Sequence, residues 1–265
     1  MDTTTLKSEI TSHVRNLAAL TTEAARSEVM KKYLETCAKF HCYSACNQML
    51  IMLSHPDASQ VAGFVTWKKL NRFVRRGEKG IPILAPCVYK KDPDSEESPK
   101  VVKGFRVVYV FDISQTDGED LPPEPDWKSP QKNLELQDHL IKFAESRQVQ
   151  VWTREQRGEV QGSSAGGVIE LSPEAGTKTL IHELAHELLH HGPDKFELTR
   201  QNKELEAEAV AFVVASHFGL ADLASPNYLA LWDADSNKIL ERMDRIRDTA
   251  TEIIRGVEPE DELTD

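Results

Sequence analysis

The stretch His182-Glu183-Leu-Ala-His186 combines two metal-ligand side chains with a carboxylate at the spacing of one helical turn. Four residues of α-helix rise about 6 Å and turn slightly past one revolution, so both imidazoles project from one face toward a single ion. Glu183 follows the first histidine directly, where its carboxylate can reach water beside the ion. The pattern predicts metal-assisted hydrolysis with Glu183 as the catalytic base. The alternative is a core helix whose histidines only form hydrogen bonds.

The third ligand must come from outside this helix. Leu189 stands where the longer metzincin pattern requires glycine, and Gly192 stands where that pattern has a third histidine. The next predicted helix carries Glu204, Glu206 and Glu208 among small apolar residues. Glu204 and Glu208 lie four residues apart and share a face, whereas Glu206 is rotated by about 200° from Glu204 and should point elsewhere.

This acidic helix resembles that of the glutamate zincins, in which one acidic residue is the third ligand and a carboxylate one turn later supports a histidine. The resemblance implies that Glu204 binds the metal and Glu208 orients a histidine, with the reverse assignment as an alternative. A solvated acidic face is the other explanation. Nitrogen and carboxylate ligands favour zinc, although availability could load manganese or another divalent ion.

Residues 165–173, Ala-Gly-Gly-Val-Ile-Glu-Leu-Ser-Pro, predict a short strand just before the metal helix. In the metallopeptidase arrangement that it resembles, such a strand borders the cleft and can pair with an extended peptide. An ordinary core strand is the alternative. For oxyanion stabilisation, residue type alone offers four candidates, and none is assigned: Tyr228, His190, His191 and His217.

Length and composition indicate a globular protein of the α+β class with two domains. The 265 residues suffice for two cores, and 40% of them are apolar and 28% charged. The N-terminal segment is polar and no apolar run approaches membrane-spanning length, so we expect a cytoplasmic protein without a membrane partner.

The charge divides unevenly along the chain. Residues 1–111 carry 17 basic and 11 acidic residues, and residues 112–265 carry 15 and 32. Residues 114–130 contain four prolines and five acids, which predicts a linker. The expected domains are therefore residues 1–113 and residues 131–265, and the resemblance to the glutamate zincins implies that the second is a zincin-like metallopeptidase domain.

The hydrophobic periodicity predicts elements in both domains. In the first domain they are helices near 5–20, 22–38, 44–54 and 66–72 and strands at 81–89 and 101–111, joined by a loop at 92–99. In the second they are helices near 131–146, 177–191, 197–218, 226–232 and 235–255 and strands at 149–152 and 167–171.

The segment 61–91 carries eight Lys or Arg and one Glu, interleaved with aromatic residues. Cations beside aromatic rings suit single-stranded nucleic acid, because phosphates follow the charge while unstacked bases lie on ring faces. A solvated basic face over core aromatics is the alternative. The expected DNA-contacting residues are Trp67, Lys68, Lys69, Arg72, Arg75, Arg76 and Lys79.

Three of the four cysteines, Cys37, Cys42 and Cys46, crowd around His41. A zinc site is conceivable there, but no Cys-x-x-Cys pair is present and reduced thiols explain the residues more simply. We assign them no function.

Several separated blocks resemble the N-terminal domain of the ArdC antirestriction family. They are Tyr43-Ser44 with Asn47-Gln48-Met-Leu-Ile, Val61-Ala-Gly-Phe-Val-Thr-Trp-Lys-Lys-Leu, Val74-Arg-Arg-Gly-Glu-Lys-Gly-Ile and Phe111-Asp-Ile-Ser-Gln-Thr-Asp-Gly. The resemblance implies a protein that binds single-stranded DNA and joins this domain to a His-Glu-x-x-His metallopeptidase-like domain.

The second half is also similar to the ImmA/IrrE metallopeptidases, which cleave regulatory proteins. Two hypotheses follow. The first is an antirestriction protein that binds single-stranded DNA and carries a metal domain. The second is a DNA-associated or regulatory metalloprotease that cleaves protein substrates with metal-activated water, in which Glu183 accepts and returns the protons.

Overall fold

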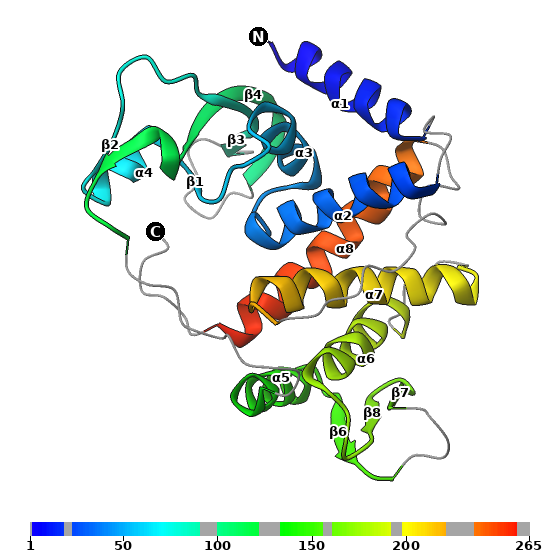
Figure 1. Ribbon diagram of the computed structural model, residues 1–265. Helices are drawn as coiled ribbons and strands as arrows, with labels where there is room; N and C mark the ends of the chain where they lie inside the picture. The colour runs from blue at the N-terminus through cyan, green and yellow to red at the C-terminus, as the bar shows by residue number, and fades with distance from the viewer. Residues whose placement is uncertain are drawn as a thin grey trace. The chain divides into compact units, whose positions relative to one another are not determined.

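The computed structural model describes residues 2–18, 23–90, 100–121, 133–155, 161–191, 198–220 and 236–258 (Figure 1). The fold is mixed α+β, which confirms the predicted class. The chain divides into two compact units, of which the first is Met1–Asn16 with Tyr43–Pro123 and the second is Leu17–Cys42 with Glu124–Asp265. Within the described ranges, no helix has the length and apolar character needed to cross a membrane.

The first unit combines helices with two antiparallel sheets, ordered β1-β4-β3 and β2-β5. β3 and β4 form the predicted pair of long strands, from Ile81 opposite Val110 to Lys90 opposite Lys100, with a register shift between Cys87 and Val88. The loop predicted at 92–99 lies outside the described residues. The elements of this unit are α1 (Thr3–Ala18, which ends in the second unit), α3 (Ala45–Ser54), β1 (Val61–Gly63), α4 (Phe64–Lys69), β2 (Arg72–Val74), β3 (Ile81–Lys90), β4 (Lys100–Asp112), a 3-10 turn (Ile113–Gln115) and β5 (Thr116–Gly118).

Asn47 attaches helix α3 to the edge of the larger sheet. Ser44 caps the helix by accepting a hydrogen bond from the Asn47 backbone N–H at 3.3 Å. The Asn47 amide donates to the Leu84 carbonyl at 3.0 Å and accepts from the Leu84 N–H at 2.8 Å. Because β3 is an edge strand, its buried backbone groups need such a partner.

Asp112 fixes the turn at the end of β4. Its carboxylate accepts hydrogen bonds from the backbone N–H groups of Ser59 at 2.8 Å, Gln60 at 3.1 Å and Ser114 at 2.9 Å. Burial raises the pKa of Asp112, but the hydrogen bonds, above all those with Ser114 and Ser59, lower it by more than burial raises it. The net pKa therefore lies below its usual value. The turn therefore depends on an ionised side chain.

The bounds of two predicted segments differ from the structure around β2 and β5. The helix predicted near 66–72 ends at Lys69, because Asn71 takes the left-handed conformation (φ 55°) and β2 begins at Arg72. The linker predicted at 114–130 begins with structure, because β5 pairs antiparallel with β2, Arg72 opposite Gly118. The composition of the whole segment hid a short strand whose partner lies far upstream. Residues 122–130 are outside the described residues.

The second unit packs helices around α7, with a three-stranded sheet ordered β6-β8-β7. β6 runs parallel to β8 and β7 runs antiparallel to it. The helix predicted near 226–232 lies outside the described residues, and β7 was not predicted. The elements are α2 (Glu23–Lys39), α5 (Leu134–Ser146), β6 (Gln150–Thr153), β7 (Gly162–Ser164), β8 (Val168–Leu171), α6 (Thr177–His190), α7 (Arg200–His217) and α8 (Ser236–Val257).

Helix α7 is the centre of this unit. It packs against α6, α8 and α2, and Ala207 and residues 209–215, which are alanines and valines apart from Phe212, are almost wholly buried. Small side chains allow neighbouring helix backbones to approach closely. The contact with α7 explains why α2 belongs to the second unit and not to the predicted domain 1–113.

Candidate functional site

Helix α6 presents His182 and His186 side by side. Its opposite face is apolar and fully buried through Leu180, Ile181 and Leu184, which fixes the direction in which the histidines project. The Nε2 atoms of His182 and His186 lie 3.2 Å apart. Two ring nitrogens at this distance can share one metal ion, as the spacing of the motif predicted.

Glu204 of α7 completes a triangle with these histidines. Its Oε2 lies 3.5 Å from Nε2 of His182 and 3.4 Å from Nε2 of His186. Bonds of about 2.0–2.1 Å from a tetrahedral zinc ion place neighbouring donor atoms about 3.4 Å apart. The three edges of 3.2, 3.4 and 3.5 Å therefore fit a divalent ion held by two imidazoles and a carboxylate. The Glu204 side chain is 51% exposed, so one side of the triangle is open to solvent.

Glu208 lies behind the triangle, one turn further along α7. Its Oε2 is 3.2 Å from Nδ1 of His182, and its Oε1 contacts Nζ of Lys178. Burial raises the pKa of Glu208, but the hydrogen bonds with His182 and Lys178 lower it below its usual value. An ionised Glu208 fixes the hydrogen of His182 on Nδ1 and leaves the lone pair of Nε2 facing His186 and Glu204.

His186 has a separate buried support. Its Nδ1 lies 3.0 Å from Nδ1 of His190, and Nε2 of His190 lies 3.3 Å from Oε2 of Glu206. Arg245 of α8 lies 3.3 Å from the same Glu206 oxygen. Glu206 does point away from the triangle, as predicted, but it reaches His186 through His190. The i, i+4 repeat of His182, His186 and His190 is the sequence signal that could have identified this connection.

The two candidate ligands differ in pKa. Burial lowers the pKa of His186 to about 4, helped by the neighbouring His182 and His190 and opposed by Glu204. Burial also lowers the pKa of His182, but Glu208, Glu183 and Glu204 outweigh it and raise the pKa above its usual value. The carboxylates thus favour positive charge at the triangle, whether carried by a proton or by a metal ion.

Glu183 lies beneath strand β7. It is buried, and burial raises its pKa; His182 and a hydrogen bond with Ser164 oppose the rise, and Glu204 and Glu187 add to it. A Cβ atom added to Gly162 would lie 2.9 Å from Cγ and 3.0 Å from Oε1 of Glu183. The backbone of β7 can pass over this carboxylate only because residue 162 is glycine.

The strand predicted to border the cleft is not an edge strand. β8, which contains the predicted residues 168–171, is paired on both sides, with β6 and with β7. Its backbone groups are therefore used within the sheet. The edge strand beside Glu183 is the shorter β7, and Glu187 of α6 holds the turn between β7 and β8 by accepting from the backbone N–H groups of Gly166 at 2.9 Å and Gly167 at 2.7 Å.

The first unit carries an exposed surface of cations and aromatic rings along α4, β2 and the start of β3, here called the basic surface. Phe64 and Phe73 are each 56% exposed. Tyr109 of β4, 50% exposed, lies against Gly80, where an added Cβ atom would come within 2.8 Å of the tyrosine Cβ. The exposed basic residues of this surface are Lys68, Lys69, Arg75, Arg76 and Lys79.

Two predicted DNA-contacting residues are structural instead. The Trp67 ring is 2% exposed and its Nε1 donates to the Phe111 carbonyl at 2.8 Å, so it offers no face for a base. Arg72 is buried and donates to Oγ1 of Thr116 at 2.9 Å. Apolar aromatic character alone could not distinguish the buried Trp67 from the exposed Phe64 and Phe73.

Arg75 is exposed but engaged. It contacts Glu78 at 2.9 Å and Asp117 at 3.4 Å, which ties β2 to the end of β5. Surface ion pairs of this kind contribute about 0–1 kcal/mol, so a phosphate could compete with them.

Residues 4–152 match the family model described as the N-terminal domain of anti-restriction factor ArdC, and this match covers more than half of the chain. The chain belongs to this ArdC family. The matched region contains the basic surface and continues through α5 to β6. Helices α6 and α7 lie beyond it, so the triangle of His182, His186 and Glu204 is outside the region that identifies the ArdC family.

The chain is also similar to one curated protein and to two solved structures. An uncharacterized Bacillus anthracis protein, pXO2-81, is 27% identical over 83% of this chain and 46% of that protein, so the chain spans about half the length of this curated relative. The antirestriction protein ArdC from plasmid R388 has been solved in a metal-free form (19% identity, TM-score 0.49, 81% of this chain and 85% of that chain) and in an Mn(II)-bound form (18%, 0.46, 85% and 97%).

Proposed function

We propose that this ArdC-family chain acts in antirestriction by binding single-stranded DNA on the basic surface of its first unit. One observation carries the proposal: two phenylalanine rings, Phe64 and Phe73, remain 56% exposed among lysines and arginines within the ArdC-matched region. A double helix hides its base faces, whereas a single strand offers them to such rings. The binding partner is therefore a single strand in preference to a duplex.

The charges around the two rings suit the phosphate backbone. Lys68 and Lys69 end α4, and Arg76 and Lys79 lie in the turn between β2 and β3, all with exposed side chains. Each phosphate neutralised by a cation releases counterions, so binding should weaken as salt rises. None of these residues contributes to the cores described above, which leaves them available for a ligand.

The test is fluorescence anisotropy with a labelled single-stranded oligonucleotide and its duplex, at a series of salt concentrations. The variant Lys68→Gln/Lys69→Gln should bind the single strand more weakly and with a flatter salt dependence, by about 1.4 in the logarithmic slope for two lost phosphate contacts. Lys32→Gln/Lys142→Gln, which removes two exposed lysines of the second unit, is the matched control. An unchanged slope in the Lys68→Gln/Lys69→Gln variant would show that this part of the basic surface does not contact the DNA phosphates.

We also propose that the second unit binds a divalent metal ion through His182, His186 and Glu204. The support is the donor triangle, whose edges suit zinc and whose donor atoms also suit manganese. Equilibrium dialysis against each ion followed by elemental analysis tests it. Loss of one bound ion per chain in Glu204→Gln supports the assignment, and an unchanged metal content contradicts it.

A metallopeptidase reaction is the second candidate function. A bound divalent ion would supply Lewis acidity toward a peptide carbonyl and toward water. Glu183 lies beside the triangle with a raised pKa, which suits a group that accepts a proton from water and returns it to the leaving amine. The edge strand β7 offers backbone groups with which an extended peptide could pair. Incubation of the metal-loaded chain with peptide libraries, with and without oligonucleotide, tests for cleavage.

A further inference from the structure

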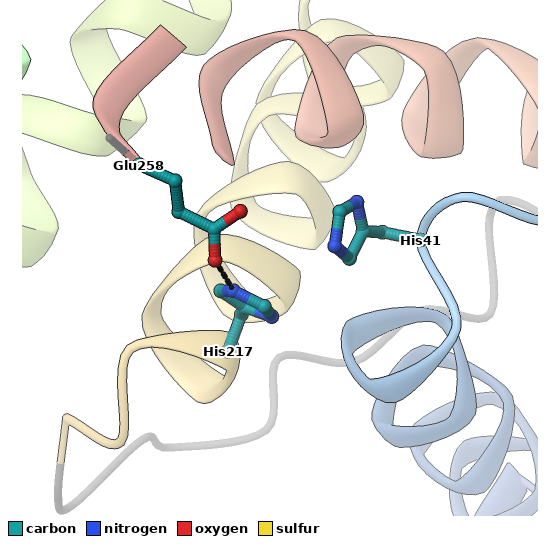
Figure 2. A group of neighbouring side chains, drawn as sticks. All are labelled: His41, His217 and Glu258. Atoms are coloured by element: carbon teal, nitrogen blue, oxygen red, sulfur yellow. Dashed lines mark hydrogen bonds and ion pairs between the residues drawn. The ribbon is translucent and has the colours of Figure 1, made fainter. Parts of the chain in front are cut away.

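We propose that His41, His217 and Glu258 form a second site for a divalent metal ion, distinct from the triangle on α6 and α7. The three residues come from distant parts of the sequence within the second unit: His41 follows α2, His217 ends α7 and Glu258 follows α8 (Figure 2). One ligand atom from each lies within 4.8 Å of the other two. Figure 2 shows the ring of His41 facing the pair formed by His217 and Glu258.

Both ring nitrogens of His217 face an oxygen atom. Its Nδ1 lies 3.0 Å from the carbonyl oxygen of Ala38, which only accepts hydrogen bonds, so Nδ1 carries a hydrogen. Its Nε2 lies 2.7 Å from Oε1 of Glu258. In the neutral ring, the Nε2 lone pair would face a carboxylate oxygen, and two acceptors repel at that distance. A proton on either partner, or a metal ion between them, removes the repulsion.

The backbone partner of His217 matches that of a metal ligand. Histidines that bind metals commonly donate their other ring N–H to a carbonyl or carboxylate, which fixes the tautomer and the ring orientation. Ala38 provides this carbonyl at the end of α2. Nε2 of His217 is thereby directed toward the carboxylate of Glu258. The ring of His41 faces the same point (Figure 2).

His41 distinguishes a metal site from a simple ion pair. Its side chain is buried, and its ring centre lies 4.9 Å from that of His217. An ion pair between His217 and Glu258 does not involve the ring of His41, whereas a metal ion would use one of its nitrogens as a third ligand.

The donor types indicate which ion fits. Two imidazoles and one carboxylate suit zinc and similar transition metals better than magnesium or calcium. Donor atoms around a tetrahedral zinc ion lie about 3.4 Å apart, so ion entry requires the 2.7 Å contact to open and His41 to move inward.

An ion at this site would have a structural role. It would join the ends of α2, α7 and α8, which are linked here by His41, His217 and Glu258. Thr251 of α8 already donates to the His41 carbonyl at 2.7 Å, so the backbone at His41 is anchored. Because the folded chain would bind the ion and the unfolded chain would not, saturating zinc should raise the melting temperature.

The experiment uses the full chain carrying His182→Ala and His186→Ala, which removes the first site. After equilibration with zinc and removal of excess, elemental analysis should find about one ion per chain. Adding Glu258→Gln or His217→Gln should abolish this retained zinc, whereas adding His55→Gln, in the first unit, should leave it unchanged. Absence of zinc from the His182→Ala/His186→Ala chain, or its retention in both added variants, would overturn the proposal.

A measurement without further mutation covers the case in which the added variants do not fold. The ring nitrogens of the His182→Ala/His186→Ala chain are followed by nitrogen-15 NMR during zinc addition. The His217 Nε2 signal should change from that of a protonated nitrogen to that of a metal-bound one. A His217 signal that stays protonated at saturating zinc identifies a plain ion pair with Glu258 and rejects the site. Failure of the first site leaves this result unaffected, because that site is absent from the chain tested.

Discussion

Oε2 of Glu208 lies 3.2 Å from Nδ1 of His182, while Oε2 of Glu204 lies 3.5 Å from Nε2 of the same ring. One imidazole therefore separates two carboxylates that share a face of α7. Glu204 contacts the nitrogen that faces His186, and Glu208 contacts the nitrogen that faces away from it. The geometry supports different roles for two residues that the sequence could not tell apart.

We expect Glu204→Gln to remove most metal affinity and Glu208→Gln to weaken it by about 10–100-fold, because the second change affects only ring orientation and basicity. Competition with a chromophoric chelator measures both constants. Saturating metal should restore full occupancy in Glu208→Gln. A larger loss in Glu208→Gln than in Glu204→Gln would reverse the two assignments.

The carboxylate of Glu183 should be dispensable for metal binding and required for any cleavage. Glu183→Gln keeps the shape of the side chain but accepts no proton, so metal content should stay at the parental level while peptide hydrolysis falls to background. Cleavage at the parental rate would show that another group is the base.

Gly162→Val tests the contact between β7 and Glu183 without changing a titratable group. Its added side chain would occupy the position 2.9 Å from Cγ of Glu183 and displace the carboxylate. Metal stoichiometry should remain the same while cleavage decreases. Gly104→Val is the control, since nothing lies within 4 Å of a Cβ atom at Gly104. Equal cleavage rates of the two variants would show that the contact between β7 and Glu183 does not affect the reaction.

Aromatic residues of the first unit should divide into core and ligand-binding groups. Trp67→Ala should destabilise the fold by about 3–5 kcal/mol, because the ring is buried. Phe64→Ala and Phe73→Ala should change stability by about 0.5 kcal/mol or less. Each should weaken single-stranded DNA binding by about 1–3 kcal/mol. Chemical denaturation and anisotropy measure the two effects, and unaltered affinity in both phenylalanine variants would contradict stacking on these rings.

Asp112 should make the first unit sensitive to acid. Its folded-state pKa is lowered, so its contribution to stability is complete above the unfolded pKa of about 3.9 and is lost as the pH falls through the folded value. Asp112→Asn should cost about 1–3 kcal/mol at neutral pH through the weakened turn. The difference from the parental chain should shrink below pH 4. Urea unfolding at several pH values measures it, and a constant difference would exclude titration of Asp112.

Local sequence was enough for features that depend on neighbouring residues. The four-residue spacing of His182 and His186 places them on one helix face wherever α6 packs, and Glu183 must follow. The strands β3 and β4 could be predicted from their own apolar runs. The blocks that resemble ArdC likewise lie in continuous segments, and the family match to residues 4–152 confirmed that resemblance.

Features that depend on long-range packing escaped the sequence. Trp67 and Phe73 have similar apolar character, but only Trp67 lies against β4, where its N–H finds the Phe111 carbonyl. β5 is a strand only because β2 supplies its partner, and its own composition predicted a linker.

The sequence by itself determined that this chain carries an ArdC-type first half. It also determined that one helix carries two histidines four residues apart, with a glutamate directly after the first. Tertiary structure alone decided which glutamate of α7 faces which nitrogen, and that His190 and Glu206 support His186 from behind. It also brought together His41, His217 and Glu258. The physical reason is that helical periodicity fixes directions within one element, whereas the contacts between elements depend on how their buried faces pack together.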